Sequence, residues 1–124
     1  MLRAVVFTLA AAAALPGAPL DADEVHAESV FLAVRGEIVD LACYVVHGGK
    51  GPQHARCAKK CAEQGQPIGL LTTDGKLYLL FADHVDVAPF GRARGLAGQN
   101  AEIKGEAVAR DGINGLTVKA VTGL

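Results

Sequence analysis

Residues 101–121 alternate apolar with polar side chains at a period of two, on either side of a turn at residues 111–115. This period is typical of β-strands that bury one face, because successive side chains of a strand point to opposite sides. A second pair of apolar runs, residues 68–71 and 77–81, flanks the dipeptide Asp74-Gly75, which favours a hairpin turn. The two hairpins predict a mainly β fold.

A long run of β-branched and apolar residues, 30–46, precedes these hairpins and is interrupted by Gly36. We expect it to form one long bent strand or a pair of strands, because glycine permits a bulge or a sharp curvature. The segment between the two hairpins, residues 83–96, contains Pro89 and two glycines. It is expected to be irregular, with one short helical turn.

The segment that follows the first strand, residues 47–66, has a different pattern. A glycine-rich loop leads to Pro52, and residues 52–64 are expected to form a helix that Gly65 ends. At about 100° per residue, the His and Cys side chains of this helix fall on one stripe. Alanines lie beside the stripe and the charged residues lie opposite, so the stripe is expected to face the sheet.

In the number and order of their strands, residues 30–121 resemble a small five-stranded Greek-key barrel of the oligonucleotide/oligosaccharide-binding (OB) type. The sequence departs from that fold in one respect. Its clear helix lies between the first and second strands, whereas the connecting helix of an OB barrel usually follows the third. We therefore expect an OB-like barrel with a helical insert between strands 1 and 2, and a β-sandwich or an unclosed barrel stays open as the alternative.

The start of the chain predicts a signal peptide over residues 1–27. Arg3 precedes residues 4–15, an uncharged run with the length of a signal-peptide core and too short to span a bilayer. Small residues offer a cut after Ala27 or earlier, and an uncleaved membrane anchor is the alternative. Residues 28–124 would then form one barrel domain, periplasmic or secreted, with no stable membrane insertion after cleavage.

Residues 28–124 carry 11 basic and 10 acidic side chains, no Trp and two Tyr. A net charge near zero and so few aromatic rings provide neither a basic stripe nor a platform for stacking bases. We therefore expect no nucleic-acid partner, even though the barrel resembles one that binds oligonucleotides.

The main candidate site combines the three cysteines with one histidine, and we call these residues the quartet: Cys43, His54, Cys57 and Cys61. Helix spacings of three and four bring the last three members to one point. Cys43, at the end of the first strand, would reach over them. Three thiolates and an imidazole suit tetrahedral Zn²⁺, and thiolates also accept Cu(I) or another thiophilic ion. His47 and His84 are possible alternate ligands.

The quartet predicts an exported metal-binding protein that acts as a carrier, a sensor or a metal-stabilised adaptor, with a metal ion and a periplasmic protein as partners. Two alternatives stay open. A disulfide from Cys43 to Cys57 or Cys61 would brace a protein-interaction domain, and a Cys57 activated by His54 would support thiol–disulfide exchange.

An enzyme is disfavoured, because four protein ligands leave a zinc ion no open position for substrate.

Residues 51–61 have the pattern Gly-x-x-His-x-x-Cys-Ala-x-x-Cys and follow a Cys-Tyr pair at residues 43–44. From Gly36 to Gly69, the stretch that contains these motifs, the chain resembles small exported bacterial proteins of unassigned function. That resemblance implies no activity.

Overall fold

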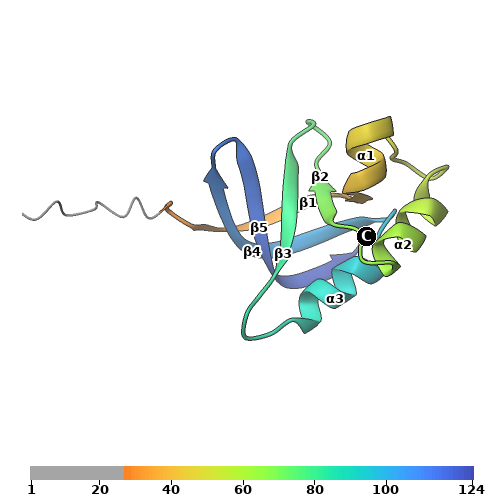
Figure 1. The fold of residues 1–124 in the computed structure, drawn as a ribbon. Coiled ribbons are helices and arrows are strands. Elements are labelled where there is room, and N and C mark those ends of the chain that lie inside the picture. Colours follow the sequence, from red (N-terminus) through yellow and green to blue (C-terminus); the bar gives the residue numbers. More distant parts are fainter. Residues whose placement is uncertain (1–26) are drawn as a thin grey trace, which may run out of the picture.

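The computed structural model describes residues 27–124 of the 124-residue chain (Figure 1). The predicted signal peptide, residues 1–27, lies outside the described residues apart from Ala27. The described helices and strands follow the chain in the order β1 (Val30–Asp40), α1 (Leu41–His47), α2 (Ala55–Glu63), β2 (Ile68–Leu71), β3 (Leu77–Ala82), α3 (Ala88–Gly95), β4 (Asn100–Arg110) and β5 (Ile113–Gly123).

The strands close into a barrel in the order β1-β2-β3-β5-β4, and β4 pairs with β1 to complete it. The neighbouring strands are antiparallel except for β3 and β5, which are parallel. The prediction of a mainly β, five-stranded barrel with a helical insert between the first two strands is therefore confirmed. The strand order and the parallel pair agree with an OB-like topology.

Strand β1 is long because it belongs to both halves of the barrel. Residues 30–37 pair with β4, and residues 37–40 pair with β2. Gly36 lies at the change of partner, where a Cβ atom would come within 2.3 Å of the Leu71 carbonyl oxygen. Only glycine allows this close approach, so the contact with β2 requires a glycine at this position.

The prediction that strand continues to residue 46 is wrong. Strand β1 ends at Asp40, whose side chain accepts hydrogen bonds from the backbone N–H groups of Ala42 and Cys43 and so begins α1. Helix α1 ends at Gly48, which has a left-handed conformation at φ 68°. An Asp N-cap and a terminating Gly outweigh the β propensity of the residues between them. The insert therefore contains two helices, and it begins earlier than the predicted residue 47.

The segment after the third strand is also more ordered than expected. Helix α3 spans Ala88–Gly95, with Pro89 in its first turn where the missing N–H costs nothing. The helix that an OB barrel usually carries after its third strand is thus present. Helices α1 and α2, between β1 and β2, remain an addition to that topology.

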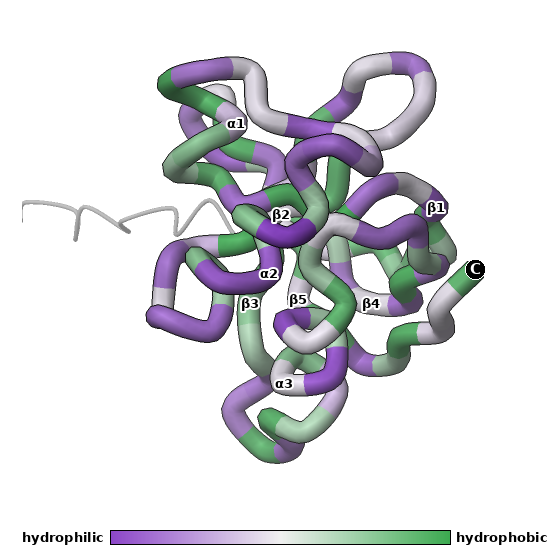
Figure 2. The backbone as a smooth tube through the Cα atoms, turned by 90° about the vertical axis from the view of Figure 1, so that its right-hand side faces the viewer, coloured by the Kyte–Doolittle hydropathy of each residue, from purple (hydrophilic) through white to green (hydrophobic). Residues whose placement is uncertain are grey.

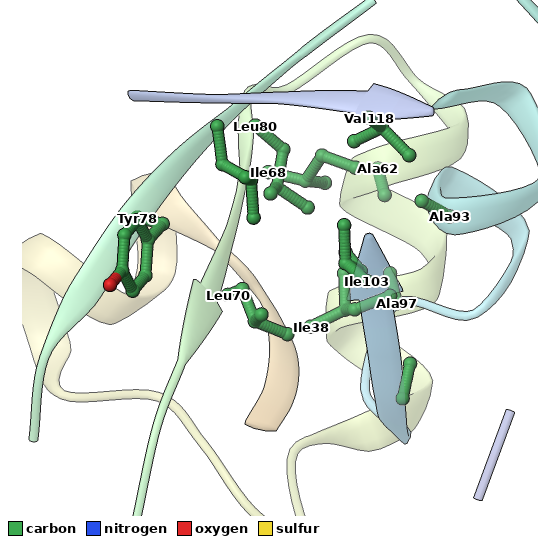
Figure 3. Packing of buried hydrophobic residues seen from close by; sticks show 12 residues of the cluster. Ile38, Ala62, Ile68, Leu70, Tyr78, Leu80, Ala93, Ala97, Ile103 and Val118 are labelled. Atoms are coloured by element: carbon green, nitrogen blue, oxygen red, sulfur yellow. The ribbon is translucent and has the colours of Figure 1, made fainter. Parts of the chain in front are cut away.

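The core lies inside the barrel and at the end covered by the helices. Its fully buried large side chains come from four strands: Ile38, Ile68, Leu70, Ile103, Leu116, Val39 and Val118. Figure 3 shows Ala62 of α2 and Ala93 of α3 entering this cluster beside Val118. These small side chains let both helices approach the strands closely. No helix in residues 27–124 is long and apolar enough to cross a membrane.

Candidate metal centre

The quartet lies on the two helices of the insert. Cys43 belongs to α1, Cys57 and Cys61 belong to α2, and His54 is the N-cap of α2. The structure therefore corrects two predictions. Cys43 is on a helix and not at the end of a strand, and α2 begins at Ala55 and not at Pro52. Figure 1 shows both helices at the same end of the barrel.

The rotation of α2 about its axis is fixed by two buried alanines. Ala58 and Ala62 are at most 2% exposed and face the barrel. Each follows a cysteine by one residue, so each cysteine lies about 100° around the helix from a buried alanine. This places the sulfurs on the flank of the helix, and Cys61 is half-buried while Cys57 is exposed. Hydrophilic residues dominate the rest of α2 (Figure 2).

The sulfur of Cys43 is the common point of the site. It belongs to a group with His54 and Cys57, and to a second group with Asp40 and Cys61, in each of which all ligand atoms lie within 4.8 Å of one another. The Sγ atoms of Cys57 and Cys61 are 4.0 Å apart. The three sulfurs are therefore mutual neighbours, and Cys43 is within 4.8 Å of a ligand atom of every other quartet member.

The imidazole of His54 packs against the end of α1. Its Nε2 atom is buried and has no hydrogen-bond partner among the described residues. A Cβ atom on Gly49 would lie 2.7 Å from that nitrogen, so glycine at this position makes room for the ring. A buried polar atom without a partner is costly, so the position of this ring lowers the stability of the fold.

Asp40 is a neighbour of the site that the sequence interpretation missed. Its carboxylate is fully buried, and it lies in one group with the sulfurs of Cys43 and Cys61. A signal was available in the sequence, because Asp is a preferred N-cap and stands three residues before Cys43. The expected strand over residues 30–46 concealed it.

Asp40 also affects the protonation of the Cys43 thiol. Hydrogen bonding to the Asp40 carboxylate raises the pKa of the Cys43 thiol to about 12, with further contributions from desolvation and from the negative charge of Asp40. Desolvation, followed by the proximity of Cys57, raises the pKa of Cys61 above its ordinary value. Without a bound cation, both thiols are therefore protonated at neutral pH.

The dimensions of the sulfur cluster fit a tetrahedral thiophilic ion. Two sulfurs at about 2.3 Å from a tetrahedral zinc ion lie about 3.8 Å apart. The Cys57–Cys61 separation of 4.0 Å is close to this value. The other separations, at most 4.8 Å, need side-chain adjustments of about 1 Å or less. His54 shares a group with Cys43 and Cys57 but not with Cys61, so an ion bound by all four residues would need a further movement of the imidazole or of Cys61.

The two alternate ligands are not brought to the site. His47 is exposed at the end of α1, and His84 is exposed in the loop before α3. Neither belongs to a group of potential ligands within residues 27–124. All three cysteines are free, so the structure contains no disulfide between Cys43 and Cys57 or Cys61.

Comparisons with known proteins add no relative to these observations. No protein-family model matches the chain, and neither a curated protein nor a solved structure matches it.

Proposed function

We propose that this chain is an exported metal-binding protein whose quartet holds Zn²⁺ or another thiophilic ion. The observation that carries the proposal is the position of the Cys43 sulfur, within 4.8 Å of a ligand atom of each of the other three members. Soft sulfurs and one imidazole are the ligands that such ions prefer. The apolar run at residues 4–15 supports export.

The relation of the site to the barrel supports a carrier or a sensor. The core is made of strand residues and of alanines from α2 and α3, and it includes no quartet member. Folding of the barrel therefore does not require the metal, in contrast to small domains that fold only around zinc. The exposed Cys57 gives a partner protein access to one ligand of the ion.

The experiment is a titration of the reduced, metal-free full chain with Zn²⁺ under anaerobic conditions, followed by elemental analysis after removal of free metal. We expect one zinc ion per chain. A chain that retains no zinc and, in the same test with Cu(I), no copper, with all thiols reduced, would contradict the proposal.

Single substitutions test which residues bind the ion. Cys43→Ser, Cys57→Ser, Cys61→Ser and His54→Ala should each weaken zinc binding by more than the roughly 10- to 100-fold that loss of an outer-shell partner costs. His47→Ala and His84→Ala are the matched controls and should bind zinc as the parent chain does. Circular dichroism should show that all variants keep the barrel.

Export is tested separately. The full chain is expressed in a bacterial host, the cells are fractionated, and the intact mass of the product is measured. We expect a periplasmic or secreted product shortened by about 27 residues. A full-length product in the cytoplasm would contradict export and leave the metal-binding results valid.

A further inference from the structure

The three sulfurs of the quartet are close enough to react with one another, and they differ in access to solvent. The sulfurs of Cys57 and Cys61 are 4.0 Å apart, and both lie within 4.8 Å of the Cys43 sulfur. Cys57 is exposed, whereas Cys43 and Cys61 are half-buried. A small oxidant arriving from solvent therefore meets Cys57 first.

The partner that closes a disulfide with Cys57 is decided by helix geometry. Cys61 follows Cys57 by four residues on the same helix, so their Cα atoms are about 6 Å apart along the axis and their Cβ atoms point in nearly the same direction. A disulfide needs Cβ atoms about 3.8 Å apart and directed toward each other. Cys43 lies on the other helix and meets Cys57 across the gap between them.

We propose that the quartet is also a thiol–disulfide switch in which Cys57 reacts with a hydroperoxide and Cys43 closes the disulfide, while Cys61 stays a thiol. The regulation of metal binding described below rests on the proposed function. The disulfide itself does not.

The reaction has two balanced steps. The thiolate of Cys57 attacks the terminal oxygen of the hydroperoxide, the O–O bond breaks, and the leaving oxyanion takes a proton from water, so that Cys57 becomes a sulfenic acid. The sulfur of Cys43 then attacks the sulfur of Cys57. A disulfide forms, and the hydroxide that leaves combines with the thiol proton of Cys43 as water. Two thiols are oxidised and one peroxide is reduced.

The switch would control the proposed metal site. A Cys43–Cys57 disulfide removes two of the four ligands, one of which is the sulfur that neighbours all the others. Among the described residues, no group of neighbouring ligand atoms contains both of the remaining residues, His54 and Cys61. Oxidation should therefore release the ion, and reduction should restore the site.

The test uses the reduced, metal-free full chain with one equivalent of hydrogen peroxide. Remaining thiols are alkylated, and peptide mass mapping locates the disulfide. We expect a Cys43–Cys57 disulfide and an alkylated Cys61. A disulfide that joins Cys61 to either other cysteine, or no disulfide at all, would overturn the proposal.

Three variants sharpen the assignment. Cys61→Ser removes a proposed metal ligand but should still form the Cys43–Cys57 disulfide in the metal-free chain. Cys43→Ser should stop at a sulfenic acid on Cys57, which dimedone traps. Cys57→Ser should lose thiols about tenfold more slowly, because its remaining sulfurs are half-buried. The Cys43–Cys57 disulfide cannot form in Cys57→Ser. If this variant lost its thiols as fast as the parent chain does, the proposal would be overturned.

A second arm uses the zinc-loaded chain and a chromophoric chelator. Peroxide should release zinc in step with disulfide formation, and a thiol reductant should restore binding. Zinc that stays bound after the disulfide has formed would overturn the regulatory part of the proposal. A chain that never binds zinc fails the proposed function instead, and the metal-free arm still decides the disulfide.

Discussion

The carboxylate of Asp40 lies close to both the backbone N–H and the sulfur of Cys43. The Asp40 carboxylate accepts a hydrogen bond from the backbone N–H of Cys43, with an N–O distance of 3.1 Å, and a carboxylate oxygen lies within 4.8 Å of the Cys43 sulfur. One buried side chain therefore begins helix α1 and sets the electrostatic environment of the thiol at the centre of the quartet.

The first prediction concerns thiol reactivity in the metal-free chain. At pH 8 iodoacetamide should modify Cys57 first and Cys43 slowly, because Cys43 is half-buried and its pKa is about 12. Asp40→Asn keeps an N-cap but removes the negative charge, so the pKa of Cys43 should fall and its alkylation should accelerate about tenfold or more. Asp86→Asn, in the exposed loop before α3, is the control. An unchanged Cys43 rate in Asp40→Asn would contradict the role of Asp40.

The second prediction concerns protons released by the metal. The raised pKa values of Cys43 and Cys61 mean that these thiols are protonated before zinc binds and lose their protons when it does. We expect the release of at least about two protons per zinc ion and an affinity that falls as the pH is lowered. Calorimetric titrations in buffers of different ionisation enthalpy measure the release. An affinity independent of pH between 6 and about 8 would be inconsistent with thiolate ligands.

The third prediction concerns the space occupied by the His54 ring. In Gly49→Ala the new methyl group would lie 2.7 Å from His54 Nε2, so the ring must move. Zinc affinity should fall by about 10- to 100-fold, as for other changes that misalign a ligand. Gly91→Ala in α3 is the control, because a Cβ atom there meets no atom within 4 Å. Equal affinities in the two variants would show that the imidazole is not a ligand.

The fourth prediction concerns stability in acid, to which Asp83, directly after β3, contributes. Asp83 forms an ion pair with Lys119 and accepts hydrogen bonds from the backbone N–H groups of Val85 and Asp86, and these interactions lower its pKa to about 2. A carboxylate with a lowered pKa in the folded state stabilises the fold above about pH 4, and this contribution is lost as the pH falls toward 2.

Urea unfolding of the parent chain between pH 5 and about 2 should show this loss, and Asp83→Asn should be less stable at pH 5 with a weaker dependence on acid. Glu63→Gln, exposed on α2, is the control for removal of a carboxylate. A parallel dependence in Asp83→Asn and the parent would exclude Asp83 as a source of the acid sensitivity.

The strands could be predicted from the sequence because their signals are local. A period of two and a turn dipeptide mark the hairpins, and a single glycine marks the point where β1 changes its pairing partner. Helix α1 was missed because Val45 and Val46 favour strand, while the decisive interaction is a side-chain cap made by Asp40. Capping competes with propensity over only a few residues, and a pattern of apolar side chains does not reveal which wins.

The quartet could be predicted in part for the same reason. Cys57 and Cys61 are related by helix spacing alone, and their proximity needs no tertiary information. The position of Cys43 depends on where the chain turns after β1, and the burial of His54 Nε2 depends on Gly49, which packs against it. Such contacts between segments are set by packing, so the sequence indicated the candidate ligands but not their geometry.

X-ray absorption spectroscopy at the zinc edge of the loaded, reduced chain tests the central claim most directly. The account predicts three sulfurs at about 2.3 Å and one nitrogen at about 2.0 to 2.1 Å from the ion. A first shell made only of oxygen and nitrogen, or one with fewer than two sulfurs, would contradict it.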